Sequence, residues 1–108
     1  MITLDVWKNS KGLIDSYEVS GHAGYREEGQ DIICSAVSAL TQTPIYGLTN
    51  HLKLQPEVEI KKDQGFLRVT LQEEPNDLTE AILETMLLGM ESIVRQCPKY
   101  VRIHQHRR

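Results

Sequence analysis

The segment between Pro75 and Pro98 constrains the fold of this chain most strongly. Its apolar residues recur with the three- and four-residue spacing of one helical face. They are Leu78, Ile82, Met86, Leu87, Met90, Ile93 and Val94. Asn76 or Asp77 is a suitable N-cap, and Pro98 ends the pattern because proline cannot continue a helix. The segment therefore predicts a long helix whose apolar face is buried against another element.

Strand-like patterns flank this helix on both sides. Ile2, Leu4 and Val6 alternate with polar neighbours, and a turn at residues 9–12 leads into residues 13–20. Val58 and Ile60 begin a similar pattern, which passes through a turn at 63–65 into residues 66–71. Tyr100, Val101 and Ile103 form a last strand before a polar end. Alternation with a period of two predicts two hairpins and one further strand.

A second helix is expected from about Ile32 towards Leu48. Its apolar residues Ile33, Val37, Leu40 and Leu48 fall on one broad stripe. Pro44 removes a backbone donor inside this segment, and we expect it to kink the helix.

These elements predict an α+β fold in the order ββαββαβ. Two helices that pack on one face of a mostly antiparallel sheet bury both apolar stripes in one core, which gives a two-layer sandwich. A chain of 108 residues has room for one such domain, spanning residues 1–108. Specificity must then reside on this fold or at a subunit interface.

A histidine and a cysteine border a glycine-containing loop after the first hairpin. His22 follows the second strand, and Cys34 is expected in the first turn of the helix, with Asp31 as the N-cap. Unpaired amides and the helix dipole favour negative charge there, so Cys34 is expected to be activated as a thiolate. The same amides could hold an oxyanion. His22 would act as the general base and then as the general acid.

Four further residues are candidate members of this site. Asp31 either caps the helix or orients His22 as a third catalytic residue. Ser38 lies one turn after Cys34 and either faces the site or donates back to the Cys34 carbonyl. Gly24 and Gly29 suggest a mobile loop over residues 23–30.

The alternative interpretation is that Cys34 is a buried structural cysteine and that His22 only ends a strand. Cys97, just before Pro98, is interpreted in this way as a packing residue or helix terminus. His104 and His106 could in principle join His22 and Cys34 around zinc, but paired CxxC or HExxH spacing is missing. His51, at a helix end, is interpreted as a favourable partner of the helix dipole or as a surface residue. We therefore expect no metal and no cofactor.

The run GHAGY, the following glycine and DIICSAVSAL closely resemble the signature of the ribosomal-processing cysteine protease family (Prp). The resemblance implies a catalytic dyad of His22 and Cys34. It also implies a small bacterial endopeptidase that removes an N-terminal extension from the precursor of large-subunit ribosomal protein twenty-seven, and a homodimer.

Composition limits the remaining possibilities. A net charge of −3 argues against direct nucleic-acid binding as the main activity. No apolar run reaches the roughly 18 residues that span a membrane, and a cytoplasmic location is expected. Two functional alternatives stay open: a noncatalytic ribosome-associated binding module with a structural Cys34, and a thiol-dependent transferase or hydrolase of another acyl compound.

Overall fold

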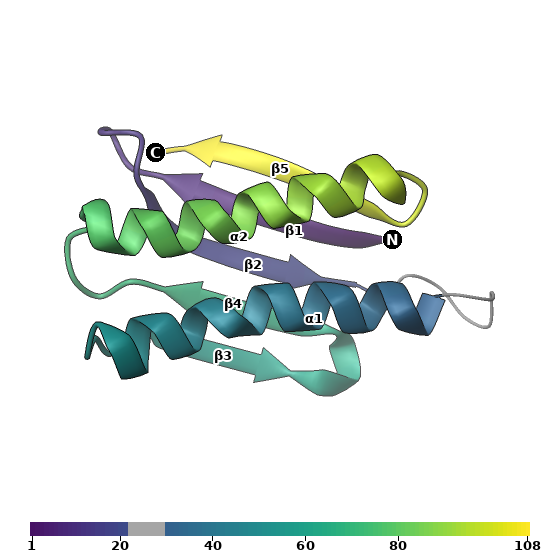
Figure 1. Ribbon diagram of the computed structural model, residues 1–108, viewed down its shortest axis with the longest axis horizontal. Helices are drawn as coiled ribbons and strands as arrows, with labels where there is room; N and C mark the ends of the chain where they lie inside the picture. Colours follow the sequence, from purple (N-terminus) through teal and green to yellow (C-terminus); the bar gives the residue numbers. More distant parts are fainter. Residues whose placement is uncertain (22–29) are drawn as a thin grey trace.

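A five-stranded sheet covered on one face by two helices forms the protein (Figure 1). The computed structural model describes residues 1–21 and 30–108, and residues 22–29 lie outside that description. The strands are β1 (Ile2–Lys8), β2 (Ile14–Ser20), β3 (Glu57–Lys61), β4 (Phe66–Thr70) and β5 (Val101–Arg107). The helices are α1 (Gln30–Tyr46) and α2 (Asp77–Gln96), with a π-helical turn η1 (Gly47–His51) and a short 3₁₀ turn η2 (Lys62–Gln64). The predicted order of strands and helices is confirmed.

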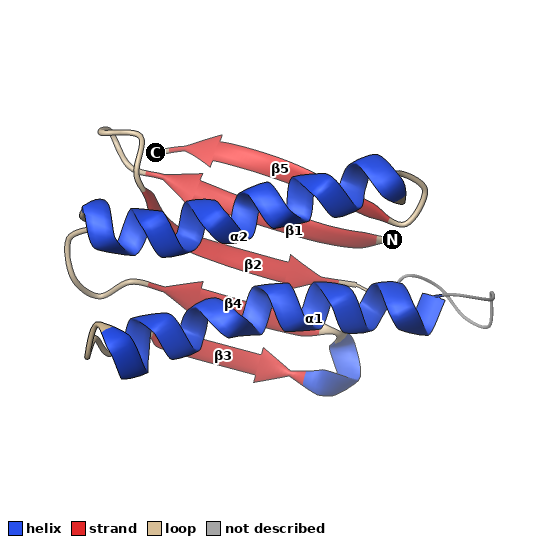
Figure 2. Ribbon diagram, in the orientation of Figure 1, coloured by secondary structure: helices blue, strands red, loops and turns tan. Residues whose placement is uncertain are grey.

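The strand order across the sheet is β3-β4-β2-β1-β5. Three of the neighbouring pairs are antiparallel, and β5 runs parallel to β1. Figure 2 shows both helices on the same side of the sheet, with α2 over the β1 and β5 side and α1 over the β4 and β3 side. The predicted two-layer α+β sandwich is confirmed, and the sheet is mixed because α2 returns the chain to lie beside β1.

The core lies between the sheet and the helices, because strand residues on the helix side are apolar. Ile2, Leu4 and Val6 are 3%, 0% and 0% exposed. Tyr17, opposite Val6 on β2, is fully buried, and its hydroxyl donates to the Thr41 carbonyl of α1 over 2.6 Å. Burial raises the pKa of the Tyr17 phenol far above its ordinary value, so this hydroxyl remains a donor.

The second helix starts at a capping box. Asn76 is the N-cap, and its side chain accepts from the amides of Leu78 and Thr79. Thr79 is buried, whereas Leu78 is 63% exposed. The expectation that Leu78 belongs to the apolar stripe is therefore wrong, because its position in the first turn points it away from the sheet. Leu83, Met86, Leu87 and Met90 form the buried stripe.

The last strand is longer than the sequence indicated. Residues 104–107, expected as a polar end, continue β5 because they pair with β1 residues, His104 with Asp5 and His106 with Trp7. No alternation is visible in this part because Gln105 and Arg107, which continue the positions of Val101 and Ile103 along the strand, are polar and exposed. Trp7 stacks on His106 with ring centroids 4.9 Å apart.

Candidate active site

Cys34 lies in the N-terminal part of α1 and borders a cleft of about 300 Å³. It is half-buried, and its thiol is free. The helix begins at Gln30, so Cys34 is its fifth residue. The expectation that Asp31 is the N-cap is wrong, since Asp31 already lies within the helix. Cys34 consequently lies in the second turn, where the influence of the helix terminus on a thiolate is smaller than in the first.

The cleft separates α1 from one end of the sheet. The wall on α1 contains Cys34, Ser38 and Gln42, which recur every four residues on one side of the helix. The floor is apolar, with Ile2, Val19 and Leu67. The far wall comes from the turn between β3 and β4 and its flanking strands: Ile60, Lys62, Gly65 and Phe66. A cleft with an apolar floor and polar side chains on one wall is typical of a site that binds an organic molecule or a peptide segment.

Gly21 brings the chain from β2 into this cleft. Its φ is +91°, and a Cβ placed on it would lie 2.3 Å from the carbonyl oxygen of Met1. Such a distance is far below van der Waals contact, so only glycine fits at this position. His22 is the next residue and lies outside the described residues, as do Gly24 and Gly29. The assignment of His22 as the base and of residues 23–30 as a lid therefore stays a prediction.

Ser38 is exposed and lines the cleft one turn after Cys34. Thr41, Thr43 and Thr49 each donate back to the carbonyl four residues earlier. Within the part of the chain that the structure describes, the Ser38 hydroxyl makes no such bond to Cys34. Its hydroxyl is therefore available to a molecule in the cleft.

Cys97 is positioned differently. It is the C-cap of α2, where its amide donates to the Ile93 carbonyl over 2.8 Å. The interpretation of Cys97 as a helix terminus is confirmed. Because Cys97 is not among the residues that line the cleft, it serves as an internal control for Cys34.

The histidines of β5 do not join Cys34. His104 and His106 lie on the uncovered face of the sheet, with ring nitrogens 3.7 Å and 2.7 Å from Asp5 Oδ1. Cys34 lies on the helix side, so these residues cannot share a zinc ion with it. Among residues 1–21 and 30–108, no group of three potential ligands could hold a metal ion.

The part of the cleft that sequence analysis missed is the wall from β3 and β4. Ile60, Lys62 and Phe66 were interpreted only as a hairpin, because nothing in their order along the chain indicates that the turn folds back towards Cys34. The sheet order places β4 beside β2, and this pairing brings the β3–β4 turn to the end of the sheet where Gly21 lies. A long-range strand pairing of this kind is not visible in local sequence patterns.

The fold and the cleft define a class of small two-layer α+β proteins that present a free cysteine thiol to a cleft. The family model described as "Cysteine protease Prp" matches residues 1–102, and the chain belongs to this family. The chain is therefore a cysteine protease.

Two curated relatives have similar sequences. The ribosomal processing cysteine protease Prp of Staphylococcus aureus (strain Mu50 / ATCC 700699) is 29% identical over 107 residues, which cover 96% of this chain and 98% of that protein. The protein of the same description from Bacillus subtilis (strain 168) is 26% identical over 99 residues, or 88% of each chain.

Solved structures agree with this assignment. The SMU.848 protein of Streptococcus mutans superposes with a TM-score of 0.89 at 25% identity, covering 100% of this chain and 96% of that one. The Prp protease of Staphylococcus aureus, in complex with a covalently linked product peptide, gives a TM-score of 0.88 at 26% identity, covering 97% and 99%. None of the helices in the described residues is long and apolar enough to span a bilayer.

Proposed function

We propose that this protein is a cysteine endopeptidase that removes the N-terminal extension of large-subunit ribosomal protein twenty-seven in the bacterial cytoplasm. The observation that carries the proposal is Cys34, a free thiol that borders a cleft with an apolar floor. The relatives described as ribosomal processing proteases support the substrate. A free nucleophilic thiol and a ribosomal substrate both fit a reducing compartment.

The proposed reaction proceeds through a thioester. His22 accepts the thiol proton as Cys34 Sγ attacks the carbonyl carbon of the scissile bond, and the tetrahedral intermediate loses the amine, which takes the proton from His22. Water, deprotonated by His22, then attacks the thioester and releases the new carboxylate together with the free thiol. The role of Gly21 is to direct the chain into the cleft immediately before His22.

The decisive experiment is incubation of the protein with the unprocessed ribosomal protein, followed by mass spectrometry of the product. We expect a single trimmed species with wild type and none with Cys34→Ala, because alanine lacks a nucleophile while it preserves the helix. Cys97→Ala should cleave normally, since Cys97 is a helix terminus outside the cleft lining. Normal trimming by a folded Cys34→Ala protein would refute the assignment.

A thiol-dependent transferase or hydrolase of another acyl compound is distinguished in the same assay. Such an enzyme would react at Cys34 with an activated ester but leave the ribosomal protein uncut. In that case, no residue of the cleft would serve to bind a peptide beyond the scissile bond.

A further inference from the structure

The sheet face that the two helices leave uncovered carries a second cavity, of about 250 Å³. The residues that line it are Trp7, Ser16, Arg68, Thr70 and Arg108. Ser16 pairs with Trp7 on β1 and with Thr70 on β4, so one row of side chains crosses three strands. The strand neighbours Val6, Tyr17 and Val69 are buried in the core, and successive side chains of a strand point to opposite faces. The cavity therefore lies on the opposite side of the sheet from Cys34.

Trp7 forms an aromatic wall of this cavity and is held in place by His106. The indole stacks on the His106 ring, with centroids 4.9 Å apart and planes inclined by 18°. His106 is held in turn by Asp5, whose Oδ1 lies 2.7 Å from His106 Nε2. His106 lies on β5, whereas the other strand residues of the lining belong to β2 and β4. The cavity thus borders the side of the indole that His106 leaves open, and this side is a preformed surface for a second planar ring.

Two guanidinium groups contribute positive charge to the lining. Arg68 Nε donates to Glu18 Oε1 over 2.9 Å. Arg108 Nε donates to Asp15 Oδ2 over 2.7 Å, and its Nη2 donates to Ser16 Oγ over 2.9 Å. These bonds engage one edge of each planar group, and a guanidinium carries five N–H donors. Because the two arginine side chains are 50% and 51% exposed, their other donors are accessible to an anion.

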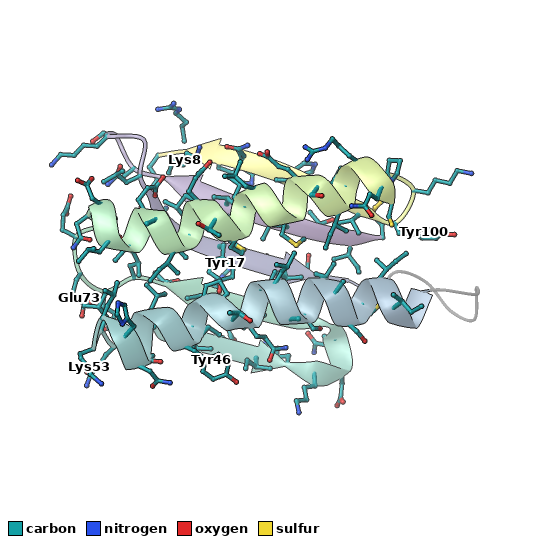
Figure 3. The ribbon with its side chains drawn as sticks, viewed as in Figure 1. Lys8, Tyr17, Tyr46, Lys53, Glu73 and Tyr100 are labelled. Carbon is teal, nitrogen blue, oxygen red and sulfur yellow. The ribbon has the colours of Figure 1, made fainter. Side chains whose placement is uncertain are left out.

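A bulge in β2 helps to hold Arg108 at the cavity. The register of β1 with β2 shifts between Trp7 and Lys8, which leaves Asp15 as an extra residue of β2. A bulge re-aims side chains, and here Asp15 and Ser16 both bind the Arg108 side chain. The Arg108 amide donates to the Lys8 carbonyl over 2.9 Å, at the end of β1 where Figure 3 labels Lys8. Arg108 is therefore held by its backbone and by its side chain before a ligand arrives.

We propose that this cavity binds a nucleoside monophosphate, with the base stacked on Trp7 and the phosphate bound by Arg68 and Arg108. An aromatic side chain stacks on any of the bases, because every base has a flat π-face. Guanidinium groups bind phosphate oxygens through pairs of parallel hydrogen bonds. A nucleotide joins a planar ring to an anion in one small molecule, and the cavity offers a partner for each. The proposal is independent of the proposed function, because the cavity and the cleft at Cys34 share no lining residue.

A single nucleotide fits the charges around the cavity better than a nucleic-acid strand does. Glu57 pairs with Thr70 and Glu59 pairs with Arg68, so these two carboxylates of β3 lie on the same sheet face as the cavity. A strand that continued across this face would place further phosphates beside carboxylates, and the net charge of −3 adds to the repulsion. Pockets for drug-sized ligands measure roughly 300–1,000 Å³. A cavity of about 250 Å³ suits one base with its phosphate.

The first test is isothermal titration calorimetry of the wild-type protein with four ligands. They are adenosine monophosphate (AMP), adenosine, ribose 5-phosphate and tetra-adenylate. We expect AMP to bind with a Kd of about 1 mM or less. AMP should bind at least about tenfold more tightly than adenosine or ribose 5-phosphate, because each of these keeps only one of the two contacts. Absence of AMP binding in the millimolar range overturns the proposal. Tetra-adenylate that binds more than about tenfold more tightly than AMP would assign the face to a strand and also overturn it.

The second test removes the two contacts separately. We expect Trp7→Leu to weaken AMP binding at least about fivefold and Arg68→Gln to weaken it about tenfold. Tyr46→Leu and Arg102→Gln are the matched controls and should bind AMP as wild type does. Tyr46 is an exposed aromatic residue that Figure 3 labels on α1, on the covered side of the sheet. Arg102 Nε donates to Thr3 Oγ1 over 3.0 Å, and Arg102 is not among the residues that line the cavity.

Unchanged AMP affinity in a cavity variant that circular dichroism shows to be folded overturns the proposal, as does an equal loss in the controls. The ligand series on wild type decides the matter if a variant fails to fold. Alkylation of Cys34 with iodoacetamide should leave AMP affinity unchanged, because the cleft lies on the other face of the sheet. Loss of AMP binding after alkylation would place the nucleotide in the cleft and overturn the proposal. Dissociation of a wild-type dimer by AMP in sedimentation experiments would assign the uncovered face to a second copy of the chain and overturn it too.

Discussion

At the scale of single residues, the cleft joins side chains from distant parts of the chain: Cys34 on α1, Val19 on β2 and Phe66 on β4. Cys34 and Ser38 were predicted as site residues, and both line the cleft. Asp31 was assigned as an N-cap from its residue type and the residues after it, but α1 already includes Gln30 and Asp31. The far wall, Lys62 and Phe66, depends on strand pairing that no local pattern records.

Gly21 provides the sharpest test of how the backbone shapes this site. We expect Gly21→Ala to lower kcat/KM for ribosomal-protein processing at least tenfold, because a Cβ would collide with the Met1 carbonyl and displace the chain that leads to His22. The free energy of unfolding of the Gly21→Ala variant should also fall, by about 1–3 kcal/mol.

Gly12 is the matched control for this substitution. Its φ is +80°, but nothing lies within 4 Å of the position that a Cβ would take. The free energy of unfolding should therefore fall by about 1 kcal/mol in Gly12→Ala, from backbone strain alone. This variant should process substrate normally. Both variants are compared by urea denaturation and by turnover at a temperature at which each is fully folded. Equal turnover in the two variants would show that the backbone at Gly21 does not position the site.

At the scale of helices and strands, local patterns were sufficient for the order and type of every predicted element. The α2 helix was located from its apolar spacing and from two prolines, since these signals lie within one turn of the helix ends. The continuation of β5 to Arg107 was missed, because Gln105 and Arg107 are polar at the positions where an apolar alternation would continue. Pairing with β1, nearly 100 residues away in sequence, stabilises that part of the strand.

The Tyr17 hydroxyl fixes α1 to β2 and so holds the cleft wall against the sheet. Tyr17→Phe removes the 2.6 Å hydrogen bond to the Thr41 carbonyl, which is itself buried. We expect the free energy of unfolding to fall by about 1–2 kcal/mol, as measured by urea denaturation. Tyr46→Phe is the matched control, because the Tyr46 side chain is 63% exposed. Its free energy of unfolding should differ from that of wild type by no more than about 0.5 kcal/mol. Equal effects at the two positions would contradict a specific role for the Tyr17 bond.

At the scale of the whole molecule, the sheet has two edges with different surroundings. The edge strand β3 borders the cleft, whereas β5, at the other edge, lies beside β1 and beneath α2. The predicted fold class included both helices on one face, but local periodicity cannot specify which strands form the edges. Strand order depends on contacts between distant segments, and it is strand order that places Ile60 of the edge strand in the same cleft lining as Cys34.

The two edges provide a test within one molecule. We expect hydrogen exchange to slow in β3 and in the N-terminal half of α1 when a tetrapeptidyl chloromethyl ketone is attached to Cys34 as a thioether, because the bound peptide covers both walls of the cleft. Exchange in β5 should be unchanged, since no β5 residue lines the cleft and three strands separate β5 from β3. Labelling with iodoacetamide supplies the matched control, because it modifies the same thiol without a peptide. Equal protection of β3 and β5, or slowing of exchange in β3 by iodoacetamide alone, would mean that the peptide does not lie along β3.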